Sequence, residues 1–332
     1  MTVVTAEAHA NIALVKYWGK HSVGDNIPAT PSLSITLDAL TTRTRIEAGS
    51  SFQQDTIVLN GEQIHVPKVN ACVARLRALS EEPFSFVKIT SKNNFPTAAG
   101  LASSASGYAA LVTALNELGS LKLSTRQLSI YARIASGSAA RSIYGGFTCL
   151  NTSSEANTSE SWQATQILNE QDWPLQVVIA ICTEKEKSTP SSIGMQLSRD
   201  TSPYYGSWVQ STKKDFDLCR QAVLEKDFER VATISEHSCL KMHGLMLSTS
   251  PGLVYWNAAT IECIHALRAL RKSGVAVFFT IDAGPQVKAV CLPGAVESVN
   301  RVLSAVSGVR RTLVTGLGSA ARVVDSGPEH ST

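Results

Sequence analysis

The hydrophobic and polar residues of the first hundred positions form short apolar or alternating runs, which are typical of β-strands. These runs lie at residues 3–8, 11–15, 34–37, 42–46 and 84–89. Between them, residues 53–66 suggest a hairpin, because Asn60-Gly61 suits the type I′ turn that joins paired strands. A helix from about Val69 to Leu79 follows, with Lys68 at its start. We therefore expect a sheet-rich first part.

Helical spacing begins after residue 103. Five apolar residues there recur at intervals of three and four and predict a helix that ends near Gly119: Tyr108, Leu111, Val112, Leu115 and Leu118. The next helix should start at Ser124, because Gln127 three residues later completes a capping box, and it should run to about Ala135.

The second half alternates apolar strands with longer helical patterns. Strands are predicted at 175–182, 276–281, 309–315 and 320–324, and helices at about 204–225, 227–239, 253–273 and 293–306. A chain of 332 residues is expected to form about two domains. We place the boundary after residue 185, which gives domains at 1–185 and 186–325 and a tail at 326–332.

Composition and charge exclude several classes of partner. The net charge of +3 is too small to indicate binding to nucleic acid or to a membrane surface. No apolar run approaches the length of a membrane span, and the N-terminus lacks the pattern of a signal peptide. The seven cysteines are widely spaced, without a C-x-x-C pair, and are typical of reduced thiols. We expect a cytoplasmic protein with a small-molecule substrate and with neither nucleic acid nor membrane as a partner.

The segment from Thr97 to Ser106 predicts a phosphate site. Every side chain in it except Leu101 is small, and it lies between a predicted strand and a predicted helix. Such a loop lets backbone N–H groups approach an anion at the positive end of a helix. Ser103 and Ser104 could contact a phosphate oxygen or its Mg²⁺. A helix start built for close packing is the alternative, and no Walker A sequence is present.

Three further clusters combine charged and small residues. Lys16 and Lys20 flank two aromatic residues and a glycine, which makes either an anion clamp or an ordinary solvated lysine pair. The segment 136–147 holds serines, glycines and Arg141, and is either a second anion site or a plain turn. Asp282 ends an apolar strand, where acidic residues are often only turn formers.

These clusters resemble one known family. The sequence N-N-F-P-T-A-A-G-L-A-S-S-A-S-G-Y-A at 93–109 resembles, nearly letter for letter, the phosphate loop of mevalonate diphosphate decarboxylases. They belong to the superfamily of galactokinase, homoserine kinase, mevalonate kinase and phosphomevalonate kinase. The resemblance continues in family order through A-N-I-A and K-Y-W-G-K (10–20), residues 28–34, S-G-S-A-A-R-S (136–142), K-M-H (241–243) and D-A-G-P (282–285). The chain departs from the family at Thr30-Pro31, Ala140 and Gln286.

The resemblance implies the fold and the reaction. It implies an α+β, two-domain fold of this kinase superfamily, with the active site in the cleft between the domains. The implied reaction is the ATP-dependent decarboxylation of mevalonate 5-diphosphate to isopentenyl diphosphate, with release of ADP, phosphate and CO₂. ATP and Mg²⁺ are the implied cofactors, and a homodimer is the implied assembly.

The resemblance also implies a role for each matching residue. Asp282 would orient or deprotonate the 3-hydroxyl, Lys16 would neutralise the moving phosphoryl charge, and Arg141 would hold the carboxylate. The implied substrate-binding residues are Tyr17, Lys20, Lys68, Ser136, Ser138, Arg141 and Ser192. The implied ATP-binding residues are Asn93, Pro96, Ala98, Gly100, Leu101, Ala102, Ser103 and Ser104, with Ser104 also at the metal.

Other interpretations remain open. A phosphomevalonate decarboxylase or a mevalonate-type kinase of the same fold would carry similar motifs. A non-catalytic binding relative is expected to lose Asp282, Lys16 or Arg141, and all three are present. The segment 316–321 matches a dinucleotide fingerprint but lacks the βαβ context that the fingerprint needs. His237, Cys239 and His243 have metal-ligand spacing without an evident fourth ligand, so helical core or substrate-rim positions are expected.

Overall fold

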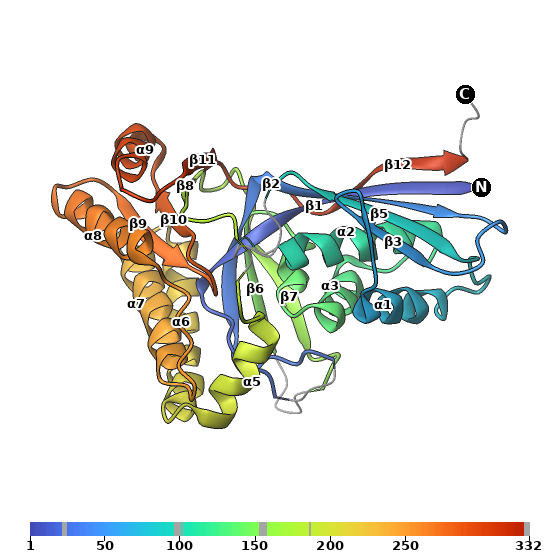
Figure 1. Ribbon diagram of the computed structural model, residues 1–332, viewed down its shortest axis with the longest axis horizontal. Coiled ribbons are helices and arrows are strands. Elements are labelled where there is room, and N and C mark those ends of the chain that lie inside the picture. The colour runs from blue at the N-terminus through green and yellow to red at the C-terminus, as the bar shows by residue number, and fades with distance from the viewer. Residues whose placement is uncertain (22–24, 96–100, 102, 153–157, 186, 329–332) are drawn as a thin grey trace.

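The computed structural model describes residues 1–21, 25–95, 101, 103–152, 158–185 and 187–328. Two sheets, each covered by helices, lie side by side in the molecule (Figure 1). Of the predicted ATP-binding residues, Pro96, Ala98, Gly100 and Ala102 lie outside the described residues.

The first sheet has eight strands and is antiparallel except where β3 pairs with β5. Its main path runs in the order β12-β1-β2-β5-β3-β4, and β6 joins β2 to β7. The strands are β1 (Thr2–Val15), β2 (Ser32–Ala48), β3 (Thr56–Leu59), β4 (Glu62–Ile64), β5 (Val87–Asn93), β6 (Phe147–Thr152), β7 (Trp162–Leu168) and β12 (Arg322–Pro328).

Helices cover one face of this sheet (Figure 1). They are α1 (Pro67–Arg77), α2 (Ser103–Leu118), α3 (Thr125–Ala135) and the short α4 (Ala139–Ser142). The apolar stripe of α2, including Leu111 and Leu115, packs on Ile46 and Ile89 of the sheet in one buried cluster. This packing holds the N-terminus of α2 at the centre of the molecule, where the predicted phosphate loop leads into it.

The second sheet has four antiparallel strands in the order β11-β8-β10-β9. These are β8 (Gln176–Ile181), β9 (Val277–Ile281), β10 (Val287–Cys291) and β11 (Arg311–Thr315). Its helices are α5 (Ser191–Thr201), α6 (Tyr205–Leu224), α7 (Phe228–Leu247), α8 (Ala258–Lys272) and α9 (Val296–Ser304), with a 3₁₀ turn, η1 (Pro293–Ala295). Every residue of β9 and β10 is buried, which is why β9 reads as an apolar run rather than as an alternating one, whereas β10, which contains Lys288, was not predicted.

The structure corrects the predicted strands of the first sheet. The four runs predicted between residues 3 and 46 are two long strands, β1 and β2, which stay paired across register shifts after His9 and Ala13. A bulge interrupts the alternation of side chains without ending the strand, so the sequence pattern suggested breaks. β5 begins at Val87 rather than at Phe84, because Phe84 and Phe86 lie under the guanidinium of Arg77 instead.

Several local predictions are confirmed. Asn60 and Gly61 both have positive φ, as a type I′ turn requires, and they join β3 to β4. The capping box of Ser124 and Gln127 opens α3. In contrast, α7 continues to Leu247, eight residues beyond the predicted end at 239.

Two strands, β8 and β12, pair with strands that lie on the other side of the predicted domain boundary at residue 185. β8 ends before that boundary but pairs with β10 and β11 of the second sheet. β12 follows the second sheet in the chain but returns to pair with β1 of the first. An apolar run shows that a strand is buried, but it does not show which sheet the strand joins.

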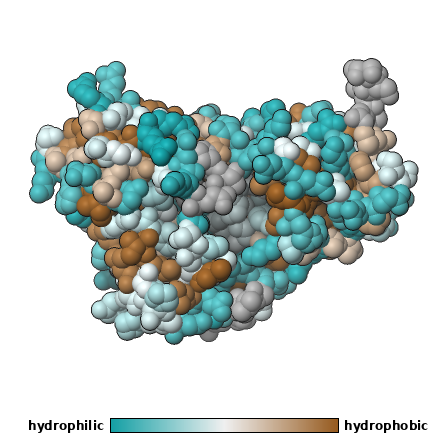
Figure 2. All heavy atoms as spheres, viewed as in Figure 1, coloured by the Kyte–Doolittle hydropathy of each residue, from teal (hydrophilic) through white to brown (hydrophobic). Residues whose placement is uncertain are grey.

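The visible face carries hydrophilic side chains with smaller hydrophobic areas over both halves (Figure 2). Within the described part of the chain, no helix is long and apolar enough to cross a membrane. Among the contacts that join the two halves, Thr280 Oγ1 of β9 donates to the Ala13 carbonyl of β1 (2.9 Å), and the Lys16 N–H donates to Ser238 Oγ of α7 (3.0 Å).

Candidate active site

A cavity of about 410 Å³ lies where the two halves meet. The end of β1, the start of α2, the 136–141 segment, the start of α5 and the residue after β9 all contribute to its lining. The cavity collects these sequence-predicted residues: Lys16, Tyr17, Lys20, Lys68, Ser103, Ser104, Ser136, Ser138, Arg141, Ser192 and Asp282. Residues predicted from six separate stretches of the chain are therefore neighbours in space.

Two predicted ATP-binding residues do not line this cavity. Leu101 is buried in the hydrophobic core of the molecule. Asn93 ends β5, and its side-chain oxygen accepts a hydrogen bond from Thr42 Oγ1 (2.7 Å). The role predicted for both residues toward ATP stays a prediction.

Asp282 is held between two buried lysines. Lys16 Nζ lies 2.7 Å from Oδ1, and Lys288 Nζ lies 3.2 Å from Oδ2. Both lysine side chains are 1 % exposed, whereas the Asp282 side chain is 25 % exposed and lines the cavity. The carboxylate therefore faces the cavity with both of its oxygens oriented by ammonium groups.

The charges around Asp282 set its protonation state. Burial alone would raise the pKa of this carboxyl, but Lys16 and Lys288 together outweigh burial and hold the pKa well below its usual range. Burial lowers the pKa of the Lys288 ammonium, and Asp282 acts in the opposite direction. The cluster carries two ammonium groups and one carboxylate, so it presents an excess positive charge at the cavity wall.

Arg141 is a buried cation surrounded by neutral oxygens. Its side chain donates to Ser32 Oγ (2.7 Å), Ser34 Oγ (3.0 Å) and Asn11 Oδ1 (3.3 Å). It is 2 % exposed, and burial lowers the pKa of the guanidinium to about 10, against opposing effects of Tyr17 and Asp282. No carboxylate among the described residues pairs with it. A buried guanidinium without a counter-ion at a cavity wall is suited to bind an anion.

The K-Y-W-G-K segment is fixed by contacts on both sides. Trp18 donates from its indole nitrogen to Ser198 Oγ of α5 (2.9 Å), and its carbonyl accepts from the Trp208 indole of α6 (2.8 Å). Gly19 has a φ of +110° and packs against the Tyr205 ring, so a side chain could not be placed there. These constraints aim the flanking lysines at the cavity.

Tyr17 packs directly on the backbone of Gly137. A Cβ built on Gly137 would lie 2.2 Å from Tyr17 Oη, which explains the glycine between two serines. The Tyr17 hydroxyl is buried and has no hydrogen-bond partner within the described residues. Burial raises the pKa of this phenol, so the group remains a neutral donor that can bond to a ligand in the cavity.

Lys20 and Lys68 place two ammonium groups at one end of the cavity. Lys20 Nζ donates to Asn26 Oδ1 (2.6 Å), and its pKa is lowered by burial and by the nearby charge of Lys68. Ser136 Oγ lies 3.5 Å from Ser104 Oγ, so the 136–138 turn and the N-terminus of α2 share this region. Such a set of donors suits a multiply charged phosphate group.

Two lysines of the site were missed by the sequence analysis. Lys187 lines the cavity, donates to Ser191 Oγ (2.7 Å) and the Ala283 carbonyl (3.1 Å), and has its pKa lowered to about 8, mainly by burial. It lies in a charged stretch whose lysines look alike in the sequence. Lys288 could have been noticed, because it is a charged residue in the middle of an apolar strand.

The predicted positions of Cys239 and His243 are helical and buried, as expected. Cys239 Sγ accepts from the Ile281 N–H (3.2 Å), and His243 Nε2 accepts from the Trp256 indole (3.2 Å). Burial and the charge of Lys16 lower the pKa of His243 to about 3, so it is neutral. Among the described residues, no group of histidine, cysteine and acidic side chains could hold a metal ion. These residues support the strand that ends at Asp282.

The three departures from the family pattern lie around the site rather than in it. Gln286 Oε1 accepts from the Cys182 N–H (2.6 Å), which ties the turn after Asp282 to the end of β8. Ala140 is fully buried, and neither Thr30 nor Pro31 lines the cavity. The cavity wall at Arg141 and Asp282 is therefore intact.

Two family models match the chain. The N-terminal domain of diphosphomevalonate decarboxylase-like proteins matches residues 8–162, and the C-terminal domain of mevalonate 5-diphosphate decarboxylase matches residues 177–319. The diphosphomevalonate decarboxylase of Candida albicans is 36 % identical over 86 % of this chain and 83 % of its own length. The human diphosphomevalonate decarboxylase is 36 % identical over 86 % of this chain and 76 % of its own length.

Solved structures agree with these matches. Mevalonate diphosphate decarboxylase from Staphylococcus aureus has a TM-score of 0.89 at 32 % identity, covering 98 % of both chains. A complex with MVAPP, AMPPCP and magnesium has a TM-score of 0.88 at 34 % identity, covering 98 % of this chain and 99 % of that one. Sequence models that match most of both halves and structures that match nearly the full length lead to one conclusion: the chain belongs to the diphosphomevalonate decarboxylase family.

Proposed function

We propose that this cavity carries out the ATP-dependent decarboxylation of mevalonate 5-diphosphate to isopentenyl diphosphate. The observation that carries the proposal is the buried Arg141, which has only neutral partners and faces the same cavity as the Lys16–Asp282–Lys288 cluster. One cation is thus free for the substrate carboxylate, and an acidic group lies nearby for the hydroxyl. One related structure of this family is a complex with MVAPP, AMPPCP and magnesium.

Asp282 acts on the tertiary hydroxyl. A tertiary hydroxyl is a poor leaving group, so ATP first converts it to a phosphate ester. Because Lys16 and Lys288 keep Asp282 ionised, its carboxylate accepts a hydrogen bond from the hydroxyl and directs the oxygen toward the γ-phosphate. The same lysines make it a weak base, so orientation of the hydroxyl is its main contribution before the proton is transferred.

Lys16 and Arg141 act on the charges that move during the reaction. Lys16 neutralises charge on the phosphoryl group as it is transferred beside Asp282. When the new phosphate leaves, the C3 carbon becomes electron-deficient, and loss of CO₂ supplies the electrons of the new double bond. Arg141 holds the carboxylate in position for this second step, and Ser32 and Ser34 hold Arg141.

The start of α2 suits the phosphates of ATP. Ser103 and Ser104 line the cavity at the N-terminus of a 16-residue helix, where N–H groups and the helix dipole favour anions. Lys187 adds a cation to the lining of the same cavity. The hydroxyl of Ser104 is of a type that would hold Mg²⁺, and the ion would supply positive charge to the phosphates of ATP.

The diphosphate of the substrate is assigned to the end of the cavity with Tyr17, Lys20, Lys68, Ser136 and Ser138. The unpaired hydroxyl of Tyr17 and the two ammonium groups supply donors for a dianionic or trianionic group. Ser192 at the start of α5 closes this end from the second half. A monophosphate would leave some of these donors unpaired, which favours the diphosphate.

The proposal is tested with purified protein, ATP, Mg²⁺ and mevalonate 5-diphosphate, with CO₂ and ADP measured together. We expect the two products in equal amounts. A mevalonate-type kinase would release ADP without CO₂, and that result would contradict the proposal.

We also propose that the protein works as a homodimer in the cytoplasm. The resemblance to the family supports the assembly, and the seven free, buried cysteines suit a reducing compartment. Sedimentation of the purified protein tests the assembly, and a monomer at enzyme concentrations used in the assay would contradict it.

A further inference from the structure

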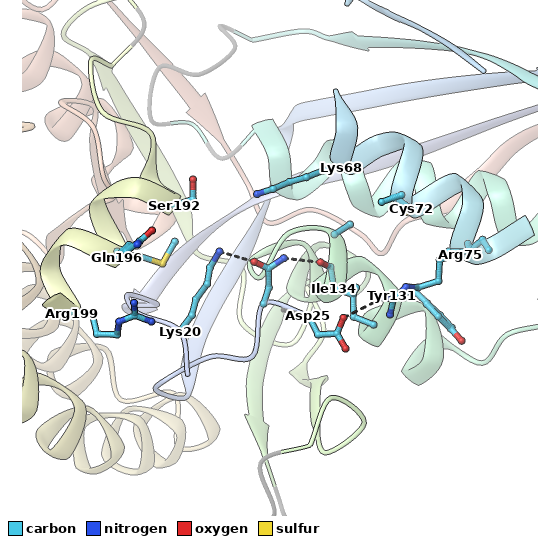
Figure 3. A pocket seen from close by; sticks show the side chains of 15 residues that line it. Lys20, Asp25, Lys68, Cys72, Arg75, Tyr131, Ile134, Ser192, Gln196 and Arg199 are labelled. Atoms are coloured by element: carbon cyan, nitrogen blue, oxygen red, sulfur yellow. Dashed lines mark hydrogen bonds and ion pairs between the residues drawn. The ribbon is translucent and has the colours of Figure 1, made fainter. Parts of the chain in front are cut away.

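A second cavity, of about 340 Å³, adjoins the active-site cavity (Figure 3). The two cavities share six lining residues: Lys20, Asn26, Lys68, Ala135, Ser192 and Met195. Beyond these shared residues, the second cavity is bounded by α1, α3, α5 and Asp25. Nothing in the proposed reaction uses this part of the molecule, although its volume lies in the range of small-ligand sites.

The far part of the second cavity is mainly apolar. Ala71, Cys72 and Leu76 contribute from α1 and Ile134 from α3, and Met195 of α5 continues this wall from the shared end. From Lys68 to Leu76, the cavity follows α1 over eight helical rises, which correspond to a length of about 12 Å. An occupant of this part would therefore be elongated and hydrophobic.

The charges in the cavity are not evenly compensated. In its far part, Arg75 pairs with Asp25 (3.3 Å), while Arg199 at the α5 wall pairs with Asp200 (2.8 Å). At the shared end, neither Lys20 nor Lys68 pairs with a carboxylate of the described residues, and Lys20 contacts only the amide oxygen of Asn26 among them. Figure 3 shows both ammonium groups pointing into the space between α1 and α5. Among the described residues that line the second cavity, positive charge that is not paired with a carboxylate is therefore found only at the end that holds Lys20 and Lys68.

We propose that the second cavity binds an alkenyl diphosphate longer than the five-carbon product, with its diphosphate on Lys20 and Lys68 and its apolar chain along α1. The charge distribution and the apolar wall match a molecule that is anionic at one end only. The proposal rests on the proposed placement of the substrate diphosphate on the same two lysines. Because both ligands need these lysines, the longer diphosphate would inhibit competitively with mevalonate 5-diphosphate.

The first experiment measures separately what the diphosphate group and the apolar chain of the ligand contribute to binding. Inhibition constants are measured for inorganic diphosphate, for five-, ten- and fifteen-carbon alkenyl diphosphates, and for the matching alcohols. We expect the ten-carbon compound to inhibit about tenfold or more tightly than the five-carbon one, because added carbons are buried on the apolar wall. Inhibition that does not depend on chain length would overturn the proposal, as would equal inhibition by the alcohols.

The second experiment fills the cavity from two sides. Ala71→Trp adds a ring on α1, and Gln196→Trp adds one on α5; Gln196 lies at the opposite wall. Ala74→Trp is the matched control, because Ala74 is also exposed on α1 but does not line the cavity. Each variant is first checked for an unchanged unfolding midpoint and unchanged kcat and KM for the substrate.

Loss of the chain-length dependence in either filling variant, with Ala74→Trp behaving as wild type, supports the proposal. Retention of the dependence in both filling variants overturns it. Lys20→Ala distinguishes this outcome from a failure of the proposed function. If Lys20→Ala leaves the KM for mevalonate 5-diphosphate unchanged, the proposed substrate placement fails, whereas the filling variants still report on the second cavity.

Discussion

Replacement of Arg141 by lysine tests how the substrate carboxylate is held. Burial lowers the pKa of the guanidinium from 12.5 to about 10, a change of about 2.5 units, which corresponds to about 3 kcal/mol. Below pH 10 the group is charged in both the folded and the unfolded protein, so the folded protein carries this penalty at neutral pH. Because Ser32, Ser34 and Asn11 offer only neutral oxygens, the penalty persists until an anion enters.

A bound carboxylate would offset that penalty, and the lysine variant should lose this contribution. An ammonium group keeps the charge but cannot offer two parallel N–H donors to a carboxylate. We expect kcat/KM for mevalonate 5-diphosphate to fall by about a hundredfold, which corresponds to about 3 kcal/mol. Exposed Arg126 of α3, which does not line the cavity, provides the control variant Arg126→Lys, which should behave as wild type.

The assay measures ADP and CO₂ together, with the substrate and with an analogue in which a methyl group replaces the carboxylate. The analogue should bind wild type and Arg141→Lys with similar affinity, because it offers Arg141 no anion. ADP release without CO₂ in the variant would assign Arg141 to the second step. Unimpaired CO₂ release, or an equal loss of affinity for the analogue, would refute this role of Arg141.

Three further predictions concern Asp282, Lys187 and Lys288. Asp282→Asn should fold and bind ATP but lose turnover by a factor on the order of a hundred or more, and near-normal turnover would remove Asp282 from the mechanism. Because Lys187 in the free protein has a pKa of about 8, kcat/KM should fall as pH rises through about 8, and Lys187→Arg should remove this fall; an unchanged profile would contradict the assignment. Lys288→Met should raise the pKa of Asp282 and move the acid limb of kcat/KM upward, whereas Lys288→Arg should not.

The sequence-based prediction of site residues agrees best with the structure where the residues belong to one short segment. Asp282 could be predicted because it ends an apolar strand within D-A-G-P, and the cavity includes it as expected. The serines at the start of α2 also line the cavity, as the small-residue segment indicated. In both cases neighbouring residues in the chain determine the local geometry.

Long-range contacts could not be predicted from the sequence. The oxygens that hold Arg141 come from positions more than a hundred residues earlier in the chain, at Asn11, Ser32 and Ser34. The second lysine on Asp282 reaches it only because β10 pairs with β9 in register. Sheet pairing decides such contacts, and a single sequence shows the strands without showing which strands pair.

The most direct measurement compares mevalonate, its 5-monophosphate and its 5-diphosphate as substrates, with ATP and Mg²⁺ present and both CO₂ and ADP quantified. We predict equal amounts of CO₂ and ADP from the diphosphate, and a much lower kcat/KM for the monophosphate. The expected preference follows from the donors of Tyr17, Lys20 and Lys68 at one end of the cavity. Equal kcat/KM values for the two esters, or a preference for the monophosphate, would contradict the diphosphate assignment, and ADP without CO₂ from all three compounds would contradict the decarboxylase.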